Sequence, residues 1–146
     1  MNPIFTTGSL EAYLPALVSL ALLCLMVVIQ SLLSAPLAFL RNEQAPGMPL
    51  QGDHSLLSFR VLRTHANSAE SLAPFGLTLL LAISVNASVQ WVNGLAMAHV
   101  AFRLLFWLIY YSGIGKVAGG PRTLSFVGGL SCNLILIIMV FTTMFY

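Results

Sequence analysis

The chain has 146 residues, a length suited to one domain of modest size. Only 7% of its residues carry a formal charge, where soluble domains carry about 25%, and 58% are hydrophobic. So few charges cannot cover a surface that faces water, and so apolar a chain cannot stay disordered. The net charge of +2 is also too small for a nucleic-acid-binding protein. Composition therefore leaves an integral membrane protein.

Long uncharged runs predict four membrane-spanning helices, because a helix needs about 20 apolar residues to cross the hydrocarbon core. The apolar residues do not alternate with polar ones as in barrel strands, for example at 77–83. Pro36 is expected to kink or end the first helix. The chain is thus predicted to be one all-α membrane domain, 1–146, with a four-helix bundle whose spans lie at about 13–40, 56–84, 89–111 and 123–145.

The basic residues of the loops predict the orientation of the bundle. Arg41, Arg60 and Arg63 fall in or next to the first connection, and Lys116 and Arg122 fall in the third. The N-terminal tail, the second connection and the C-terminus hold no Lys or Arg. The positive-inside rule then makes the first and third connections cytoplasmic and places both termini on the opposite side.

Two of the predicted helices carry a polar face into the membrane. Arg60, Arg63, Asn67 and Glu70 lie at i, i+3, i+7 and i+10 of the second helix, and therefore share one face. The third helix repeats this pattern with His99, Arg103, Phe106 and Tyr110. A charge at the bilayer centre costs at least about 2.5–3.5 kcal/mol. Arg103 and Glu70 are therefore expected to face the bundle interior or a wet cavity.

A structural ion pair between Glu70 and Arg103 is one explanation of these charges. The surplus of arginine favours another, because Arg60, Arg63, Arg103 and Arg122 face only one buried acid. Guanidinium groups bind carboxylates in a bidentate manner, and Glu70 could accept an ammonium group. A small zwitterionic ligand with an excess of carboxylate fits this set. The polar first connection, about 41–55, is the only one long enough to fold over such a site.

The pattern Arg60-x-x-Arg63-x-His65-x-Asn67-x-x-Glu70, followed by Pro74-Phe75, resembles the signature of the MAPEG family. These membrane-associated proteins of eicosanoid and glutathione metabolism include microsomal glutathione transferases and the leukotriene and prostaglandin-E synthases. Arg103 with Tyr110, and the segment Pro121-Arg122-Thr123, resemble parts of the family's third and fourth helices. The resemblance covers about residues 15–145.

The resemblance implies a homotrimer that binds glutathione between neighbouring subunits near the cytoplasmic face. It assigns glutathione binding to Arg63, Asn67, Glu70, Arg103 and Tyr110. Glu70 would hold the α-ammonium group, and Arg41 would reach a carboxylate from the adjoining subunit. Arg122 resembles the catalytic arginine that stabilises the glutathione thiolate, with Lys116 as a substitute.

The function implied is that of a membrane-bound glutathione transferase or glutathione peroxidase in detoxification. Glutathione is the cosubstrate, no metal is needed, and the second substrate is an apolar electrophile or lipid hydroperoxide from the bilayer. Ser71 and Phe106 stand where related synthases carry other residues, which argues against a dedicated eicosanoid synthase. The alternatives are a non-catalytic lipid-binding scaffold of the same fold and a small multidrug transporter with Glu70 as proton relay.

Overall fold

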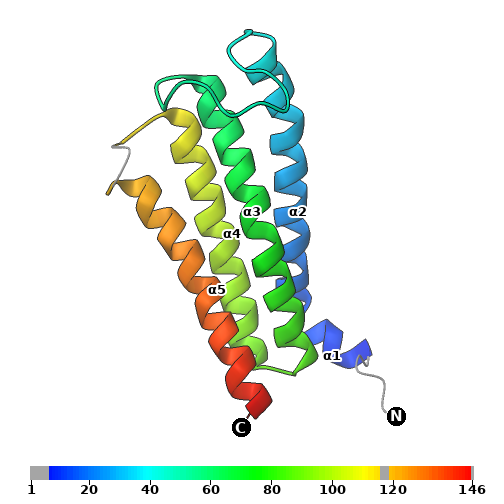
Figure 1. Ribbon diagram of the computed structural model, residues 1–146. Coiled ribbons are helices and arrows are strands. Elements are labelled where there is room, and N and C mark those ends of the chain that lie inside the picture. The colour runs from blue at the N-terminus through cyan, green and yellow to red at the C-terminus, as the bar shows by residue number, and fades with distance from the viewer. Residues whose placement is uncertain (1–6, 116–118, 146) are drawn as a thin grey trace.

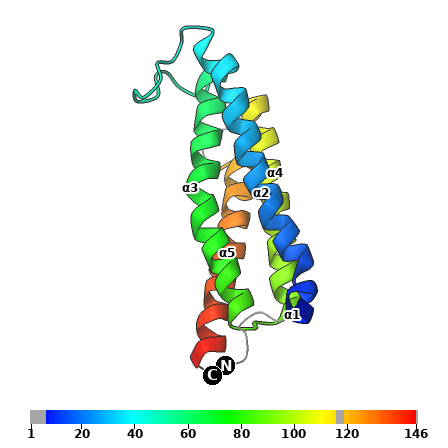
Figure 2. The ribbon, with the colours of Figure 1, turned by 90° about the vertical axis from the view of Figure 1, so that its right-hand side faces the viewer.

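The computed structural model describes residues 7–115 and 119–145, and these form an elongated helical bundle (Figure 1). The connections α2–α3 and α4–α5 lie at one end, while α1, the α3–α4 turn and the end of α5 lie at the other (Figures 1 and 2). The prediction of an all-α bundle is confirmed. A short helix, α1, precedes four long ones: α1 (Thr7–Ala12), α2 (Leu14–Ser34), α3 (Leu57–Ser84), α4 (Val89–Ser112) and α5 (Pro121–Phe145).

The helix α2 continues into a π-helical turn, η1 (Ala35–Phe39), with Pro36 in its first turn. Proline has no N–H to donate to the preceding turn, and its ring crowds the carbonyl four residues earlier. A wider turn is one way in which a helix accommodates such an insertion. The kink or end expected at Pro36 therefore takes the form of a π turn, after which the chain leaves the helix.

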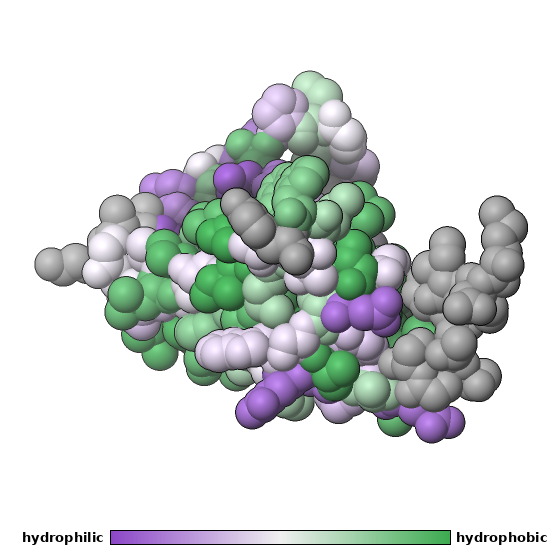
Figure 3. Space-filling model, turned by 90° about the horizontal axis from the view of Figure 1, so that it is seen from below, coloured by the Kyte–Doolittle hydropathy of each residue, from purple (hydrophilic) through white to green (hydrophobic). Residues whose placement is uncertain are grey.

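The outer surface of the bundle is apolar. Leu22, Leu32 and Leu130 are about half exposed or more, whereas Phe75 and Leu136 in the core are fully buried. Soluble monomers rarely expose large apolar side chains in such numbers. Each of the four long helices is long and apolar enough to cross a membrane, so they fit a multi-pass integral membrane protein. Figure 3 shows apolar atoms over much of the end where α1 lies, with hydrophilic atoms in separate patches.

Small residues allow α4 and α5 to pack closely. A Cβ atom added at Gly128 would lie 2.5 Å from the ring of Phe102, so only glycine leaves room for this ring. One turn away, His99 Nδ1 lies 2.9 Å from the carbonyl oxygen of Gly129. The carbonyl can only accept, so Nδ1 carries the proton and donates. This contact fixes the face of α4 that carries Arg103 against α5.

Hydrogen bonds also tie the other end of the bundle together. Asn93 on α4 accepts from the backbone N–H of Ala16 at 3.2 Å and donates to the carbonyl of Ala12 at 2.9 Å. The hydroxyl of Tyr13 donates to the carbonyl of Ala87 in the α3–α4 turn. Buried backbone groups in a membrane need such partners, because lipid supplies none.

Candidate functional site

The connection between α2 and α3 is held in place by a buried glutamine. Gln44 Nε2 donates to the carbonyl of Gln51 at 2.7 Å, and its Oε1 accepts from the N–H of Gln51 at 3.0 Å. The same Nε2 lies 3.4 Å from the hydroxyl of Ser58 on α3. These bonds fold the loop back on itself and fasten it to the first turn of α3.

Arg60 fixes the second half of this loop. Its Nη1 donates to the carbonyl oxygens of His54 at 2.8 Å and Ser55 at 2.9 Å. Its guanidinium also lies against the C-terminal end of α4, where a Cβ at Gly113 would come within 3.1 Å of it. Arg60 therefore uses its charge to hold His54 over the end of α4, and it is not free to bind an external anion with those donors.

A polar cavity of about 310 Å³ opens beneath the loop. This volume is at the lower end of the range of about 300–1,000 Å³ that is usual for small-molecule sites. None of its lining residues within the described part of the chain is acidic, whereas two are arginines. The polar cavity is lined by His54, Arg63, Asn67, Phe106, Tyr110, Arg122, Thr123 and Phe126.

Arg122 reaches this cavity from the first turn of α5. Pro121 begins that helix, which suits proline because the first helical N–H has no partner within the helix. The Arg122 guanidinium lies over the ring of Tyr110, 4.8 Å from its centroid. The positive end of the α5 dipole adds to the guanidinium charge, so this corner of the cavity favours an anion.

His54 lies between Tyr110, which was predicted to bind glutathione, and Arg122, which was predicted to be catalytic. Its Nδ1 is 2.8 Å from the Tyr110 hydroxyl and 3.3 Å from Arg122 Nη1. Burial lowers the pKa of His54 below its usual value, and the neighbouring charge of Arg122 lowers that pKa further. A pKa below 6.5 leaves the imidazole mostly neutral at pH 7.

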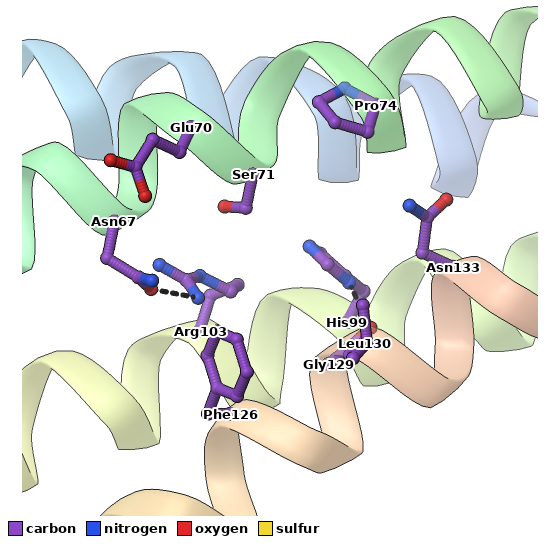
Figure 4. A pocket seen from close by; sticks show the side chains of 10 residues that line it. All are labelled: Asn67, Glu70, Ser71, Pro74, His99, Arg103, Phe126, Gly129, Leu130 and Asn133. Atoms are coloured by element: carbon purple, nitrogen blue, oxygen red, sulfur yellow. Dashed lines mark hydrogen bonds between the residues drawn. The ribbon is translucent and has the colours of Figure 1, made fainter.

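A second cavity, the inner cavity, lies further along the bundle between α3, α4 and α5 and has a volume of about 210 Å³ (Figure 4). Asn67 and Phe126 line both cavities, so the two adjoin. Pro74, Phe126 and Leu130 give the inner cavity apolar walls. The full lining is Asn67, Glu70, Ser71, Pro74, His99, Arg103, Phe126, Gly129, Leu130 and Asn133.

Arg103 is buried in the lining of the inner cavity, with 3% of its surface exposed. Its Nη1 donates to Asn67 Oδ1 at 2.8 Å, as Figure 4 shows, and its Nη2 donates to the Ser68 hydroxyl at 3.0 Å. The guanidinium also lies 5.0 Å from the centroid of the Phe106 ring. These donors are directed to neutral groups on α3, so the ion pair between Arg103 and Glu70 considered from the sequence is not formed by them.

The structure brings most of the predicted site residues together. Arg63, Asn67, Tyr110 and Arg122 line the polar cavity, and Glu70 and Arg103 line the inner one with Asn67. The side chains of Arg63 and Glu70 are exposed, so this part of the site is open at the surface of the chain.

Two predicted residues lie elsewhere. Arg41 is exposed in the loop after η1 and belongs to the lining of neither cavity. Lys116, the substitute considered for Arg122, lies outside the described residues.

Sequence reasoning missed His54. The length of the first connection predicts a loop that can fold over a site, but no pattern in the sequence distinguishes the histidine within it. The signal in the sequence is a titratable side chain two residues after Gly52, and in the structure this glycine has a φ of +82°, which marks a sharp turn of the loop. No periodicity links position 54 to positions 110 and 122, so only the folded chain shows that they meet.

The fold and the site define a class of protein: a membrane-embedded four-helix bundle with an arginine-lined cavity at one end of its helices. The sequence model of the MAPEG family matches residues 12–142, and the chain belongs to that family. The resemblance inferred from the second-helix motif is thereby confirmed. The family includes glutathione transferases and also members that are not enzymes. Neither the curated proteins nor the solved structures contain a match to this chain.

Proposed function

We propose that this protein is a membrane-bound glutathione transferase, with glutathione peroxidase activity toward lipid hydroperoxides. The observation that carries this proposal is the polar cavity, which combines Arg63 and Arg122 with Tyr110 and contains no acid among its described lining residues. Unmatched guanidinium groups in a partly enclosed site favour an anionic ligand. Glutathione carries two carboxylates and one ammonium group, which matches these arginines together with Glu70.

The positions of the side chains suggest how glutathione lies. Arg63 binds a carboxylate of the tripeptide, and Glu70 accepts the α-ammonium group at the rim of the inner cavity. Asn67 lines both cavities and is held by Arg103, so its amide is preorganised to bind the peptide backbone. The thiol then lies in the remaining corner, near Arg122 and Tyr110.

The chemical role of Arg122 is to stabilise the thiolate. A thiol with a pKa of about 8.5 is only about 3% ionised at pH 7. A guanidinium within hydrogen-bonding distance lowers the pKa of an acid by roughly 1–3 units. If the pKa falls by about two units, roughly three quarters of the bound glutathione is in the thiolate form at pH 7. This shift corresponds to about 2.7 kcal/mol of stabilisation of the thiolate relative to the thiol. No protein nucleophile is required.

The inner cavity is the proposed entry for the second substrate, because it has apolar walls and shares Phe126 with the polar cavity in which the thiol is proposed to lie. In a transfer reaction, the thiolate sulfur bonds to an electrophilic carbon and the leaving group departs with its electron pair. In a peroxidase reaction, the sulfur attacks a peroxide oxygen and the O–O bond breaks. The lipid becomes an alcohol after protonation, and a second glutathione reduces the resulting sulfenic acid with formation of disulfide and water.

We further propose that the protein is a homotrimer of single-domain subunits, with the site completed by a neighbouring subunit. The exposed side chains of Arg63 and Glu70 leave room for such a partner, and Arg41 would come from it. The excess of basic residues in and next to the α2–α3 and α4–α5 connections supports a cytoplasmic location for this end of the bundle. Mass measurement of the purified protein in detergent tests the trimer.

The test of function is the ultraviolet absorbance of thiolate when glutathione is added to the purified protein, together with calorimetry. We expect saturable binding and a thiolate signal at pH 7. Binding without thiolate would reject catalysis, and absence of binding would favour a lipid-binding scaffold. Proton-coupled drug efflux that requires Glu70 but not Arg63 would support a transporter instead.

A further inference from the structure

The geometry around His54 determines which of its ring nitrogens carries the proton. An arginine guanidinium can only donate hydrogen bonds. Arg122 Nη1 lies 3.3 Å from His54 Nδ1, so Nδ1 presents its lone pair and the proton of the neutral ring is on Nε2. The Tyr110 hydroxyl, 2.8 Å from the same Nδ1, must then donate to it. A free base thus faces the corner where Arg122 and Tyr110 meet.

We propose that His54 is the proton acceptor for the glutathione thiol, with the Tyr110 hydroxyl as the relay between them. This inference rests on the proposed function, since it assigns a role within the same site. The S–H bond breaks as its proton passes to the Tyr110 oxygen, while the Tyr110 O–H proton passes to His54 Nδ1. The products are a thiolate, a neutral tyrosine and an imidazolium, so no further reactant is needed.

The relay also improves the binding of the thiolate. Before the transfer, the Tyr110 proton is directed at His54. After the transfer, His54 Nδ1–H donates to the Tyr110 oxygen, and the proton now on Tyr110 comes from the sulfur and points back toward it. The thiolate is therefore hydrogen-bonded by Tyr110 and by Arg122 together.

The charges around His54 are suited to a base that is used repeatedly. Arg122, Arg60 and Arg63 disfavour its protonated form, and among the described residues only the charge of Asp53 favours it. The negative charge of the new thiolate offsets the positive charges of these arginines while the proton is being transferred. Because His54 lies on a loop and is partly exposed, its imidazolium can then release the proton to water and recover the neutral base.

A base also has to be kept in place, and here the loop contributes. The carbonyl of His54 accepts from Arg60 Nη1 at 2.8 Å, and its ring packs edge-on against Phe59 and Tyr110. The backbone and the ring of His54 are thus both fixed. A histidine positioned only to shield Arg122 from water would not need its unprotonated nitrogen directed at the tyrosine hydroxyl.

The test uses the full-length protein in detergent and compares His54→Gln with wild type. Glutamine can accept hydrogen bonds from Tyr110 and Arg122, but it cannot take up a proton. General acid–base catalysis contributes roughly 10²–10⁴-fold. We expect the rate of thiolate formation, followed by stopped-flow absorbance after mixing with glutathione at pH 7, to fall by about 10²-fold in His54→Gln. Calorimetric affinity and the final amount of thiolate should change little.

Two further samples separate the possible outcomes. Met48→Ala alters an exposed residue of the same loop and should form thiolate at the wild-type rate. Added imidazole should restore part of the rate in His54→Ala. An unchanged rate in His54→Gln would refute the proposal, as would loss of glutathione binding in that variant, which would make His54 a binding residue. If wild-type protein binds no glutathione, the proposed function itself fails.

Discussion

Replacement of Arg122 by alanine should uncouple glutathione binding from glutathione activation. In the structure, the Arg122 guanidinium lies over the Tyr110 ring and within 3.3 Å of His54 Nδ1, at the corner proposed for the thiol. If the arginine lowers the thiol pKa from about 8.5 to about 6.5, the thiolate fraction at pH 7 falls from roughly 76% to about 3% in Arg122→Ala. Conjugation of a soluble electrophile at saturating glutathione should then slow by about 25-fold at pH 7.

The pH dependence distinguishes this mechanism from simple damage to the site. At pH 9 a thiol with a pKa of about 8.5 is already about 76% ionised, so the deficit of Arg122→Ala should shrink to less than about twofold. Arg122→Lys keeps the charge without the planar fork, and should be intermediate. The assay is the initial rate across this pH range, with thiolate absorbance measured in parallel. A deficit of equal size at pH 7 and pH 9 would refute the role of Arg122 in thiol ionisation.

Three further predictions concern the other parts of the molecule. Glu70→Gln should weaken glutathione binding by about 10-fold or more, since a charge-assisted hydrogen bond contributes about 1.5–3 kcal/mol. Calorimetry should show no such loss of affinity for glutathione whose α-amino group is acylated. Equal losses for both ligands would contradict the assignment of Glu70 to the ammonium group. His54 has a lowered pKa in the folded protein, so its contribution to stability is complete above about pH 6.5 and is lost as the pH falls below that value. Thermal unfolding of wild type should therefore lose stability relative to His54→Gln between pH 7 and pH 5, and parallel curves would refute this. Gly128→Ala should destabilise the bundle by about 1–3 kcal/mol, because the new methyl group overlaps the Phe102 ring. Gly94→Ala is the control and should not destabilise it, because a Cβ at that position meets no atom within 4 Å. Equal melting temperatures for the two variants would show that the Phe102 ring moves aside.

The sequence alone determined the architecture of this protein. Length, hydropathy and the scarcity of charge leave few alternatives for a chain whose backbone must satisfy its own hydrogen bonds in lipid. The predicted spans therefore agree with the helices to within a few residues, apart from the short α1 that was not expected. The second-helix motif from Arg60 to Glu70 also indicated the family through its resemblance to the family signature, and helical periodicity placed its polar residues on one face.

Only the tertiary structure shows which of the predicted polar residues line a cavity and which bind other parts of the chain. Arg60 and Arg63 have the same charge and lie one turn apart, yet Arg60 binds loop carbonyls while Arg63 lines the polar cavity. Arg103 and Glu70 looked like a pair, but Arg103 donates to Asn67 and Ser68.

His54 is the clearest case of a position that sequence reasoning could not reach. It meets Tyr110 and Arg122 because Gln44 and Arg60 fold a loop of irregular structure over the ends of two helices. Helical periodicity relates residues along one element, whereas contacts between a loop and distant helices depend on the packing of the whole bundle. The helices could be predicted because a backbone in lipid must satisfy its own hydrogen bonds. The α2–α3 loop is not subject to that requirement, so its conformation follows only from the tertiary structure.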